Sequence, residues 1–238
     1  MKLDILVFAA HPDDAELSCS GTIIKHIKLG KKVGIVDLTR GEMGTRGTAE
    51  IRDEESKAAS VILGIHVREN LEMEDGFFEL SKENQLKVIQ MIRKYQPEVI
   101  LANAIEDRHP DHGRAAKLIQ EVHFKSGLTK VHTSYNGIEQ KAWRAKKVFH
   151  YIQDRLLKPD FVVDITEEMD QKMESVRAFK SQFYDPNSAE PSTYISSPDF
   201  YEAIISRCRE MGKLSKGTYA EGFTVIKTIE VDNLDSIF

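Results

Sequence analysis

The sequence predicts an α/β fold, built on a mostly parallel sheet in the doubly wound order 3-2-1-4-5 with helices on both faces, in three α/β/α layers. Short apolar runs alternate with segments of helical period along the first half of the chain. Glycine or proline follows most of the helical segments. A hydrophobic content of 41% and a charged content of 30% are ordinary for a globular chain, so we expect a single domain over residues 1–238.

The first half is expected to hold four strands, which are short apolar runs at residues 3–9, 32–38, 67–73 and 98–102. Helices are expected at residues 17–29, 50–63, 82–95 and, behind a loop over 103–112, to about residue 124. Gly30, Gly64 and Pro97 end the first three helices, and Ser81 caps the third. This regular alternation predicts right-handed crossovers and therefore parallel neighbouring strands.

The second half is less regular. Strands are expected at residues 146–153, 160–165 and 219–229, and helices at 167–179 and 199–211. The segment 181–198 is polar and contains prolines and serines, which predicts a loop. Because no repeat, low-complexity tract or firm boundary occurs, this irregular C-terminal part is expected to belong to the same domain.

Charge and cysteine content narrow the function classes. The net charge of −5 gives no basic footprint, so nucleic acid is not an expected partner. The apolar run behind Lys2 is too short for a signal peptide or a membrane span. Cys19 and Cys208 form neither a disulfide framework nor a CxxC metal motif. We therefore expect a cytoplasmic protein without a membrane partner.

A histidine and two carboxylates follow the first strand directly. They are His11, Asp13 and Asp14, and the pattern turns helical from Ala15. Such strand–turn–helix junctions are where α/β proteins bind ligands, most often with glycines against a nucleotide. Here the junction carries side chains that bind a cation. By itself the cluster is equally well explained as a turn histidine and a helix N-cap.

A second cluster follows the fourth strand in the same way, over residues 106–112, and contains His109, Asp111 and His112. In the doubly wound order, strands one and four are neighbours, and the crevice outside their carboxyl ends is the expected ligand site. The two clusters should therefore face each other. Together their complementary donor types favour a metal site.

Two imidazoles and a carboxylate, from His11, Asp14 and His112, would leave open positions on a metal ion, as catalytic sites do. The same set suits iron(II). Asp13 would stay free beside a metal-bound water and act as the general base. His109 would stabilise an oxyanion or protonate a leaving amine, with Asp111 orienting it. These roles describe a metal-assisted hydrolase of a carbonyl compound.

Three other kinds of site fit less well. A dinucleotide site requires GxGxxG after the first strand, and carboxylates there would repel a pyrophosphate. An oxygenase triad of His11, Asp13 and His112 belongs to all-β barrels, whereas this chain alternates strands and helices. A serine or cysteine nucleophile lacks support, because no GxSxG occurs and Cys19 lies within a helix.

The loop over residues 39–48 follows the second strand, rims the same crevice and is rich in glycine and arginine. Arginines there suit an anionic or polyhydroxylated substrate, although a flexible solvated loop explains any single one as well. Tyrosines in or beside the loop 181–198 can also reach a substrate. The substrate-binding candidates are Arg40, Arg52, Arg108, Tyr194 and Tyr201.

The segments AHPDD (residues 10–14) and HPDH (109–112) resemble the paired motifs of the PIG-L/LmbE-like zinc-dependent N-acetylglucosaminyl deacetylases. The loop TRGE (39–42), the helix start IRDEE (51–55) and the late segment YAEGF (219–223) match as well. The resemblance covers nearly the whole length. Within the family the chain is most similar to the deacetylases of bacillithiol biosynthesis.

The resemblance implies a Rossmann-like fold and a hydrolase that removes acetyl from an N-acetylglucosamine conjugate. For the bacillithiol branch the implied substrate is N-acetylglucosaminyl malate, which yields glucosaminyl malate and acetate. The implied cofactor is Zn²⁺ on His11, Asp14 and His112. Asp13 matches the general base, and His109 matches the imidazole that assists the tetrahedral intermediate, with Asp111 behind it.

The resemblance also assigns substrate contacts. Arg52 matches a substrate-pocket arginine. A family tyrosine that helps to polarise the carbonyl falls near the loop 181–198, where Tyr201 is the first candidate and Tyr194 the second. Some relatives are hexamers, so a homo-oligomer is an expectation for this chain.

Several alternatives stay open. Within enzymes they are a deacetylase of chitooligosaccharides or another amino sugar, and a thiol-conjugate amidase. Outside enzymes, a non-catalytic metal- or sugar-binding protein uses the same scaffold. Asp13 argues against this last alternative, because metal binding alone does not need it.

Overall fold

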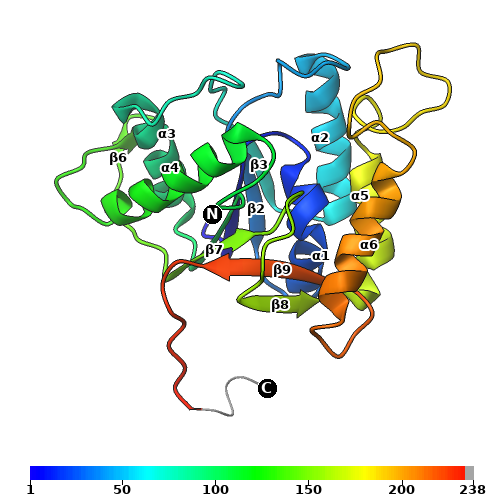
Figure 1. The fold of residues 1–238 in the computed structure, drawn as a ribbon. Helices are drawn as coiled ribbons and strands as arrows, with labels where there is room; N and C mark the ends of the chain where they lie inside the picture. Colours follow the sequence, from blue (N-terminus) through cyan, green and yellow to red (C-terminus); the bar gives the residue numbers. More distant parts are fainter. Residues whose placement is uncertain (234–238) are drawn as a thin grey trace.

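A computed structural model describes residues 1–233 and confirms the α/β prediction (Figure 1). The sheet has the order β3-β2-β1-β4-β7-β9-β8. Its parallel strands are β1 (Ile5–Ala9), β2 (Val33–Asp37), β3 (Val67–Asn70), β4 (Val99–Ala102) and β7 (Lys147–Tyr151). The predicted order 3-2-1-4-5 corresponds to these five strands. The predicted extent of the domain includes residues 234–238, which lie outside the described part.

Two strands extend the sheet beyond β7. They are β9 (Ala220–Val225), which pairs antiparallel with β7, and β8 (Phe161–Asp164), which pairs antiparallel with β9. The last strand ends at Val225, earlier than the predicted residue 229. Thus β9 runs between the two strands that the sequence predicts before it.

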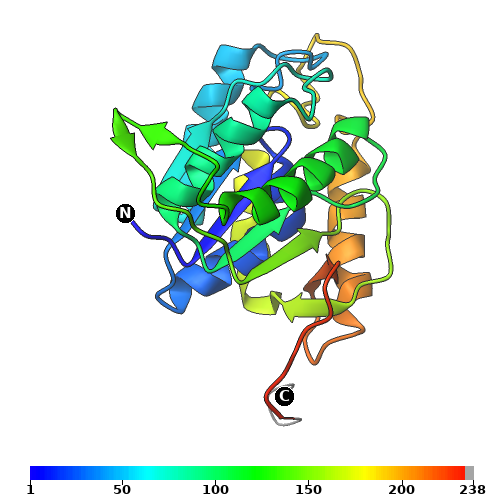
Figure 2. The same ribbon diagram turned by 90° about the vertical axis from the view of Figure 1, so that its left-hand side faces the viewer.

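Helices cover both faces of the sheet (Figures 1 and 2). Leu6 and Phe8 of β1 pack in one core with α3 (Lys82–Tyr95) and α4 (Pro110–Ser126). Ile5 and Val7, which point the other way, pack with α1 (Asp14–Lys28). Three further helices complete this second layer: α2 (Ala49–Leu63), α5 (Met169–Arg177) and α6 (Phe200–Gly212). The 3-10 turn η1 (Thr166–Glu168) directly precedes α5. Both faces of β1 are buried, which explains its uninterrupted apolar run.

Two local differences from the prediction occur, and the first bears on the site. The helix α4 begins at Pro110, so Asp111 and His112 lie in its first turn rather than in a loop. A short hairpin, β5 (Ser134–Tyr135) and β6 (Ile138–Glu139), was not predicted. It turns at Asn136 and Gly137, whose positive φ angles are typical of a two-residue hairpin turn.

The parallel register brings the carboxyl ends of β1, β2 and β4 to one edge of the sheet. The segments that follow these strands start at Ala10, Leu38 and Asn103. Thr39 donates to the carbonyl of Ala10, and the Asn103 side chain accepts from the backbone N–H of Ala10. The strand ends therefore hold the segments that carry the predicted site together. Among residues 1–233, no helix has the length and apolar character needed to cross a membrane.

Candidate metal centre

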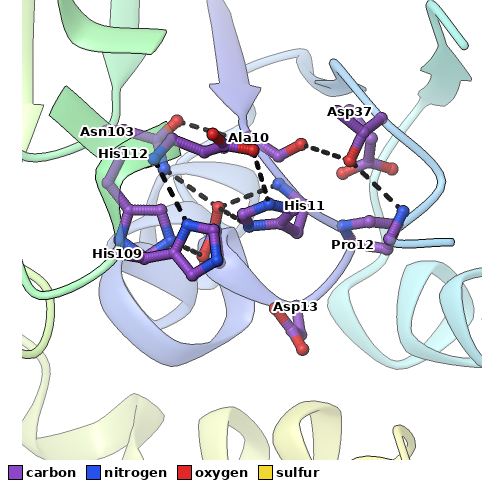
Figure 3. Close-up of polar contacts among 12 residues, drawn as sticks. Ala10, His11, Pro12, Asp13, Asp37, Asn103, His109 and His112 are labelled. Atoms are coloured by element: carbon purple, nitrogen blue, oxygen red, sulfur yellow. Dashed lines mark hydrogen bonds and ion pairs between the residues drawn. The ribbon is translucent and has the colours of Figure 1, made fainter. Parts of the chain in front are cut away.

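The two predicted clusters meet at this edge (Figure 3). The ring centroid of His11 lies 4.7 Å from that of His109 and 5.5 Å from that of His112, and the latter two are 5.2 Å apart. His11 comes from the end of β1 and the other two from the start of α4. Hence three imidazole rings from distant parts of the chain lie next to one another at this edge of the sheet.

The turn between β1 and α1 separates the two carboxylates. Asp13 takes a φ of 114°, a left-handed conformation that is uncommon for a residue with a side chain. Asp14 accepts hydrogen bonds from the His11 backbone N–H and the Asn103 side chain, both at 2.9 Å, and from Gln153 at 3.0 Å. Figure 3 shows Asp13 apart from the histidines. The strained turn thus directs adjacent carboxylates to different places.

The Asp14 carboxylate faces both predicted histidine ligands. Its Oδ1 lies 3.0 Å from Nε2 of His112, and its Oδ2 lies 3.6 Å from Nδ1 of His11. Ligand atoms of a tetrahedral zinc ion with bonds of about 2.0–2.1 Å lie about 3.3 Å apart. Asp14 therefore lies close to this spacing from each histidine, through a different carboxylate oxygen for each.

The other nitrogen of each histidine is held by a carboxylate. Nε2 of His11 lies 3.0 Å from Asp75 and 3.3 Å from Asp111, and Nδ1 of His112 lies 2.5 Å from Asp107. Metal-binding histidines commonly have such a partner, which fixes the ring and raises its basicity. The partners leave Nδ1 of His11 and Nε2 of His112 as the nitrogens that face Asp14.

Two geometric groups of possible cation donors occur among the described residues. One contains His11, His109 and His112, and the other contains His11, Asp75 and Asp111. The second group matches the outer partners of His11. In the first group, His109 accepts the backbone N–H of Asp111 on Nδ1, which leaves its Nε2 for another contact. Asp14 contacts both His11 and His112 but belongs to neither group, so its place as the third ligand stays a prediction.

The charges of the centre match a bound cation. Burial lowers the pKa of His112, but the Asp14 charge and the Asp107 hydrogen bond raise it to about 9. Burial also opposes protonation of His11, yet its carboxylate partners raise that pKa well above the usual value. Burial raises the pKa of Asp14, whereas the two histidines bring it well below the usual value. The surroundings therefore stabilise positive charge between the histidines, which a metal ion would supply.

Asp13 forms a buried ion pair instead of facing the histidines. Arg52 in α2 donates to Asp13 Oδ2 at 2.6 Å, to the carbonyl of Pro12 at 2.9 Å and to that of Gly41 at 3.2 Å. A side chain at Gly41, whose φ is +69°, would collide with Arg52. Burial raises the pKa of Asp13 to about 6, although the Arg52 charge lowers it.

A cleft of about 270 Å³ opens beside the centre and contains the three histidines, Asp13 and Asp14 in its lining. Its outer wall includes Arg46 from the loop 39–48, together with Arg108 and Tyr194. The Arg108 guanidinium lies 4.7 Å from the Tyr194 ring centre, and both residues contact Asp154, at 3.3 and 3.0 Å. This cleft is the place where a substrate can reach the predicted metal.

Two of the predicted substrate contacts, Tyr201 and Arg40, lie outside the cleft lining, and a third, Arg52, lies within it. Tyr201 packs against Phe183 in the core of α5 and α6 and does not line the cleft. Arg40 also lies outside the lining, because Asp53 and Glu50 bind it at 2.6 and 3.2 Å. Arg52 lines the cleft, but its hydrogen bonds to the protein hold it on Asp13 and the neighbouring carbonyls.

The position of Asp111 also differs from the prediction. Its carboxylate contacts His11, the Gly76 backbone N–H and Arg114, whereas its backbone N–H donates to His109. Since α4 begins at Pro110, the first helical turn directs this side chain behind His11. Asp111 therefore supports a predicted ligand instead of orienting His109.

Sequence reasoning did not assign several residues that complete the site. They are Arg46, Asp75, Asn103, Asp107 and Gln153. Asp107 and Asn103 follow β4 directly, so their place at a strand end was a usable signal. Asp75 precedes a glycine and resembles an ordinary turn residue. Arg46 lies in the glycine- and arginine-rich loop 39–48, which was a usable signal, whereas Gln153 carries none that separates it from other polar residues.

Comparisons with known proteins show which proteins the chain is similar to. Residues 6–123 match the family model PIG-L, described as GlcNAc-PI de-N-acetylase. A diacetylchitobiose deacetylase of Thermococcus kodakarensis is 30% identical, over 94% of this chain and 84% of its own length. A probable N-acetyl-α-D-glucosaminyl L-malate deacetylase 2 of Bacillus anthracis is 26% identical, over 75% and 81%. The conserved protein TT1542 of Thermus thermophilus has a similar structure, with a TM-score of 0.84, 36% identity and coverage of 97% and 98%.

Proposed function

The chain belongs to the PIG-L family of deacetylases, and from this membership we propose that it is a metal-dependent hydrolase of N-acetylglucosamine conjugates. The observation that carries the proposal is the set of donors formed by Asp14, Nδ1 of His11 and Nε2 of His112. Zn²⁺ is the proposed metal, and Fe²⁺ suits the same donors. Beside this set, the Asp13 carboxylate pairs with Arg52 instead of a histidine, so it is available for proton transfer.

The proposed reaction is hydrolysis of the acetamide. A metal held by His11, Asp14 and His112 would supply a Lewis acid that makes a water more acidic, toward a pKa of about 7. Asp13 accepts a proton from the water whose oxygen adds to the acetyl carbon, and Arg52 holds the carboxylate in place. A pKa of about 6 suits a base that must also return this proton. When the carbon–nitrogen bond breaks, the proton passes to the amine, and acetate and the free amine result.

His109 is proposed to stabilise the oxyanion. Burial and the charges of His11 and His112 lower the pKa of His109, so its ring is neutral near neutral pH. Because Nδ1 accepts the backbone N–H of Asp111, the neutral ring carries its proton on Nε2. That N–H can donate to the oxygen on which negative charge develops.

An anionic conjugate is the preferred substrate class, and N-acetylglucosaminyl malate is the specific proposal. Arg46 lines the cleft with only 5% of its surface exposed, where its Nε lies 3.6 Å from the Glu190 carboxylate without a hydrogen bond and its Nη2 donates to Ser188. Arg108 adds a second guanidinium to the same wall. Guanidinium groups bind carboxylates well, which supports a substrate with malate carboxylates. The likeness to the Bacillus anthracis protein supports the same substrate.

Diacetylchitobiose is the second candidate substrate. The relative from Thermococcus kodakarensis, whose name gives this activity, is 30% identical over 94% of this chain. A neutral disaccharide would contact the cleft through hydroxyl groups, for which Asp75, Thr45 and Gln182 offer partners. The two substrates differ in charge, so a direct comparison separates them.

Acetate release is expected from N-acetylglucosaminyl malate, with a higher kcat/KM than from diacetylchitobiose or free N-acetylglucosamine. A chelator should abolish release and added Zn²⁺ should restore it. A coupled acetate assay on the three substrates measures both effects. A preference for diacetylchitobiose would replace the malate proposal, and activity that persists after complete metal removal would refute the metal-dependent mechanism.

Tyr194 and Tyr201 give a matched pair of phenylalanine variants. Tyr194→Phe is expected to lower kcat/KM about 3- to 30-fold, because the hydroxyl that binds Asp154 at the cleft wall is lost. Tyr201→Phe should change it less than about 2-fold, since that ring packs in the core of α5 and α6. Steady-state kinetics on the best substrate compare them. A larger loss of kcat/KM in Tyr201→Phe than in Tyr194→Phe would indicate that Tyr201, and not Tyr194, contacts the substrate.

A further inference from the structure

A buried ion pair contacts the middle of α1, away from the cleft. Lys172 of α5 and Glu221 of β9 lie 2.8 Å apart, with 0% and 1% of their side chains exposed. Lys172 Nζ also donates to the carbonyls of Glu16 and Leu17, at 3.1 and 3.0 Å. No step of the proposed reaction uses either residue.

Glu221 binds the same helix one turn later. Its two carboxylate oxygens accept the backbone N–H groups of Gly21, at 3.0 Å, and Thr22, at 2.7 Å. In a regular helix such N–H groups pair with carbonyls four residues earlier, so Gly21 would pair with Leu17. Here a cation holds the Leu17 carbonyl and an anion holds the Gly21 N–H. The ion pair therefore binds both the carbonyl and the N–H that a regular helix would join by one hydrogen bond.

Close packing makes this arrangement possible. A Cβ at Gly21 would lie 2.7 Å from Ile165, so only glycine lets α1 approach this near. Ser20 adds a bond from its hydroxyl to the Glu16 carbonyl at 2.6 Å. A side chain that inserts into the ladder is an established cause of a helix bend.

Stability alone does not explain a pair of this kind. Removing two charges from water is costly, and replacing a buried ion pair by apolar side chains is often neutral or stabilising. The pair instead fixes the positions of the Glu16 and Leu17 carbonyls, which accept hydrogen bonds from Lys172. Leu17 also donates its N–H to the carbonyl of Asp13, at 2.9 Å, which connects this turn directly to the strained residue.

A second buried charged residue, from β3, contacts the same turn of α1. Arg68 of β3 donates to the Glu16 side chain at 2.6 Å and binds Asp37, at the end of β2, at 2.7 Å. The first turn of α1 is thus fixed by charged groups from β3 and α5, and the following turn by Glu221 of β9. The first turn carries both Asp13 and Asp14.

We propose that Lys172 and Glu221 are positioning residues, which set the first turn of α1 so that Asp14 faces the metal and Asp13 stays on the side of the base. The inference rests on the proposed metal-dependent deacetylase. It assigns a function to two residues outside the cleft and predicts that metal binding and turnover depend on them more than folding does.

The test replaces both charges with apolar side chains of similar size, in Lys172→Met/Glu221→Leu. We expect a Tm equal to or above that of the unaltered protein, a metal Kd weakened about 10- to 100-fold, and a kcat lowered at least about 10-fold. KM should stay within about 2-fold, because the outer cleft wall is not altered. Thermal unfolding, chelator competition with Zn²⁺ and steady-state kinetics give the three readouts.

Lys28→Met/Glu168→Gln is the matched control. This ion pair, at 3.0 Å, joins the far end of α1 to η1 next to α5, and we expect it to leave metal Kd and kcat unchanged. Glu221→Gln, which keeps an acceptor for Gly21, provides a milder second variant. Unchanged metal Kd and kcat in the variants of the proposed pair, with or without a lower Tm, would overturn the proposal, as would loss of folding in both. Absence of metal-dependent activity in the unaltered protein would instead refute the proposed function.

Discussion

Asp13→Asn is expected to lower kcat by about two to four orders of magnitude while the protein still binds one Zn²⁺ per chain. The amide has the shape of the carboxylate and can still accept the Arg52 hydrogen bond, now 2.6 Å long. It cannot accept a proton from water near neutral pH. The donors on Asp14 and the two histidines are left intact, so metal content should not fall.

Elemental analysis and steady-state kinetics on the same preparation measure the two quantities. Asp170→Asn, an exposed acidic residue in the first turn of α5, is a suitable control and should keep full activity. Undiminished turnover in Asp13→Asn would remove this residue from the mechanism. Loss of metal in the same variant would show that Asp13, and not only Asp14, binds the ion.

Much of the centre was predictable because its residues follow strands. His11, Asp13 and Asp14 come directly after β1, and His109 and His112 come after β4. The neighbouring position of these strands follows from the doubly wound order. Local sequence thus indicates which side chains reach the sheet edge, and topology indicates that they meet.

The outer partners of the histidines were less predictable for a physical reason. Asp75 reaches His11 from the segment after β3, and its identity as a partner depends on where that segment crosses the edge. The direction of the Asp111 carboxylate depends on the exact start of α4, which a sequence pattern places only to within one or two residues. Loop paths and side-chain directions, rather than element types, account for these differences.

The C-terminal strands show the same limit in the fold. Each of β8 and β9 has a β-type sequence, but nothing local predicts that β9 runs between β7 and β8. That choice buries Phe223 against Phe161, whose rings stack with centres 5.2 Å apart, and brings Glu221 to α1. Long-range packing decides it. The positioning pair on Lys172 and Glu221 was therefore not accessible from the sequence.

His112→Ala is expected to weaken metal binding by at least about a hundredfold and to reduce deacetylation in proportion to the metal lost. The substitution removes one of three proposed donors, and it leaves Asp107 without its imidazole partner and Asp14 with only that of His11. Asp107→Asn offers a graded comparison. It keeps the donor but weakens its outer support, and loss of such partners typically costs about 10–100-fold in metal affinity.

His109→Ala separates the proposed ligand set from the alternative group of three histidines. We expect it to keep full Zn²⁺ content but to lose activity, because His109 is assigned to the oxyanion rather than to the metal. His132→Ala, an exposed histidine next to the β5–β6 hairpin, should change neither quantity. Chelator competition and elemental analysis on the three histidine variants decide the assignment. Metal loss in both His109→Ala and His112→Ala would favour the group of three histidines, because both residues are ligands in that group.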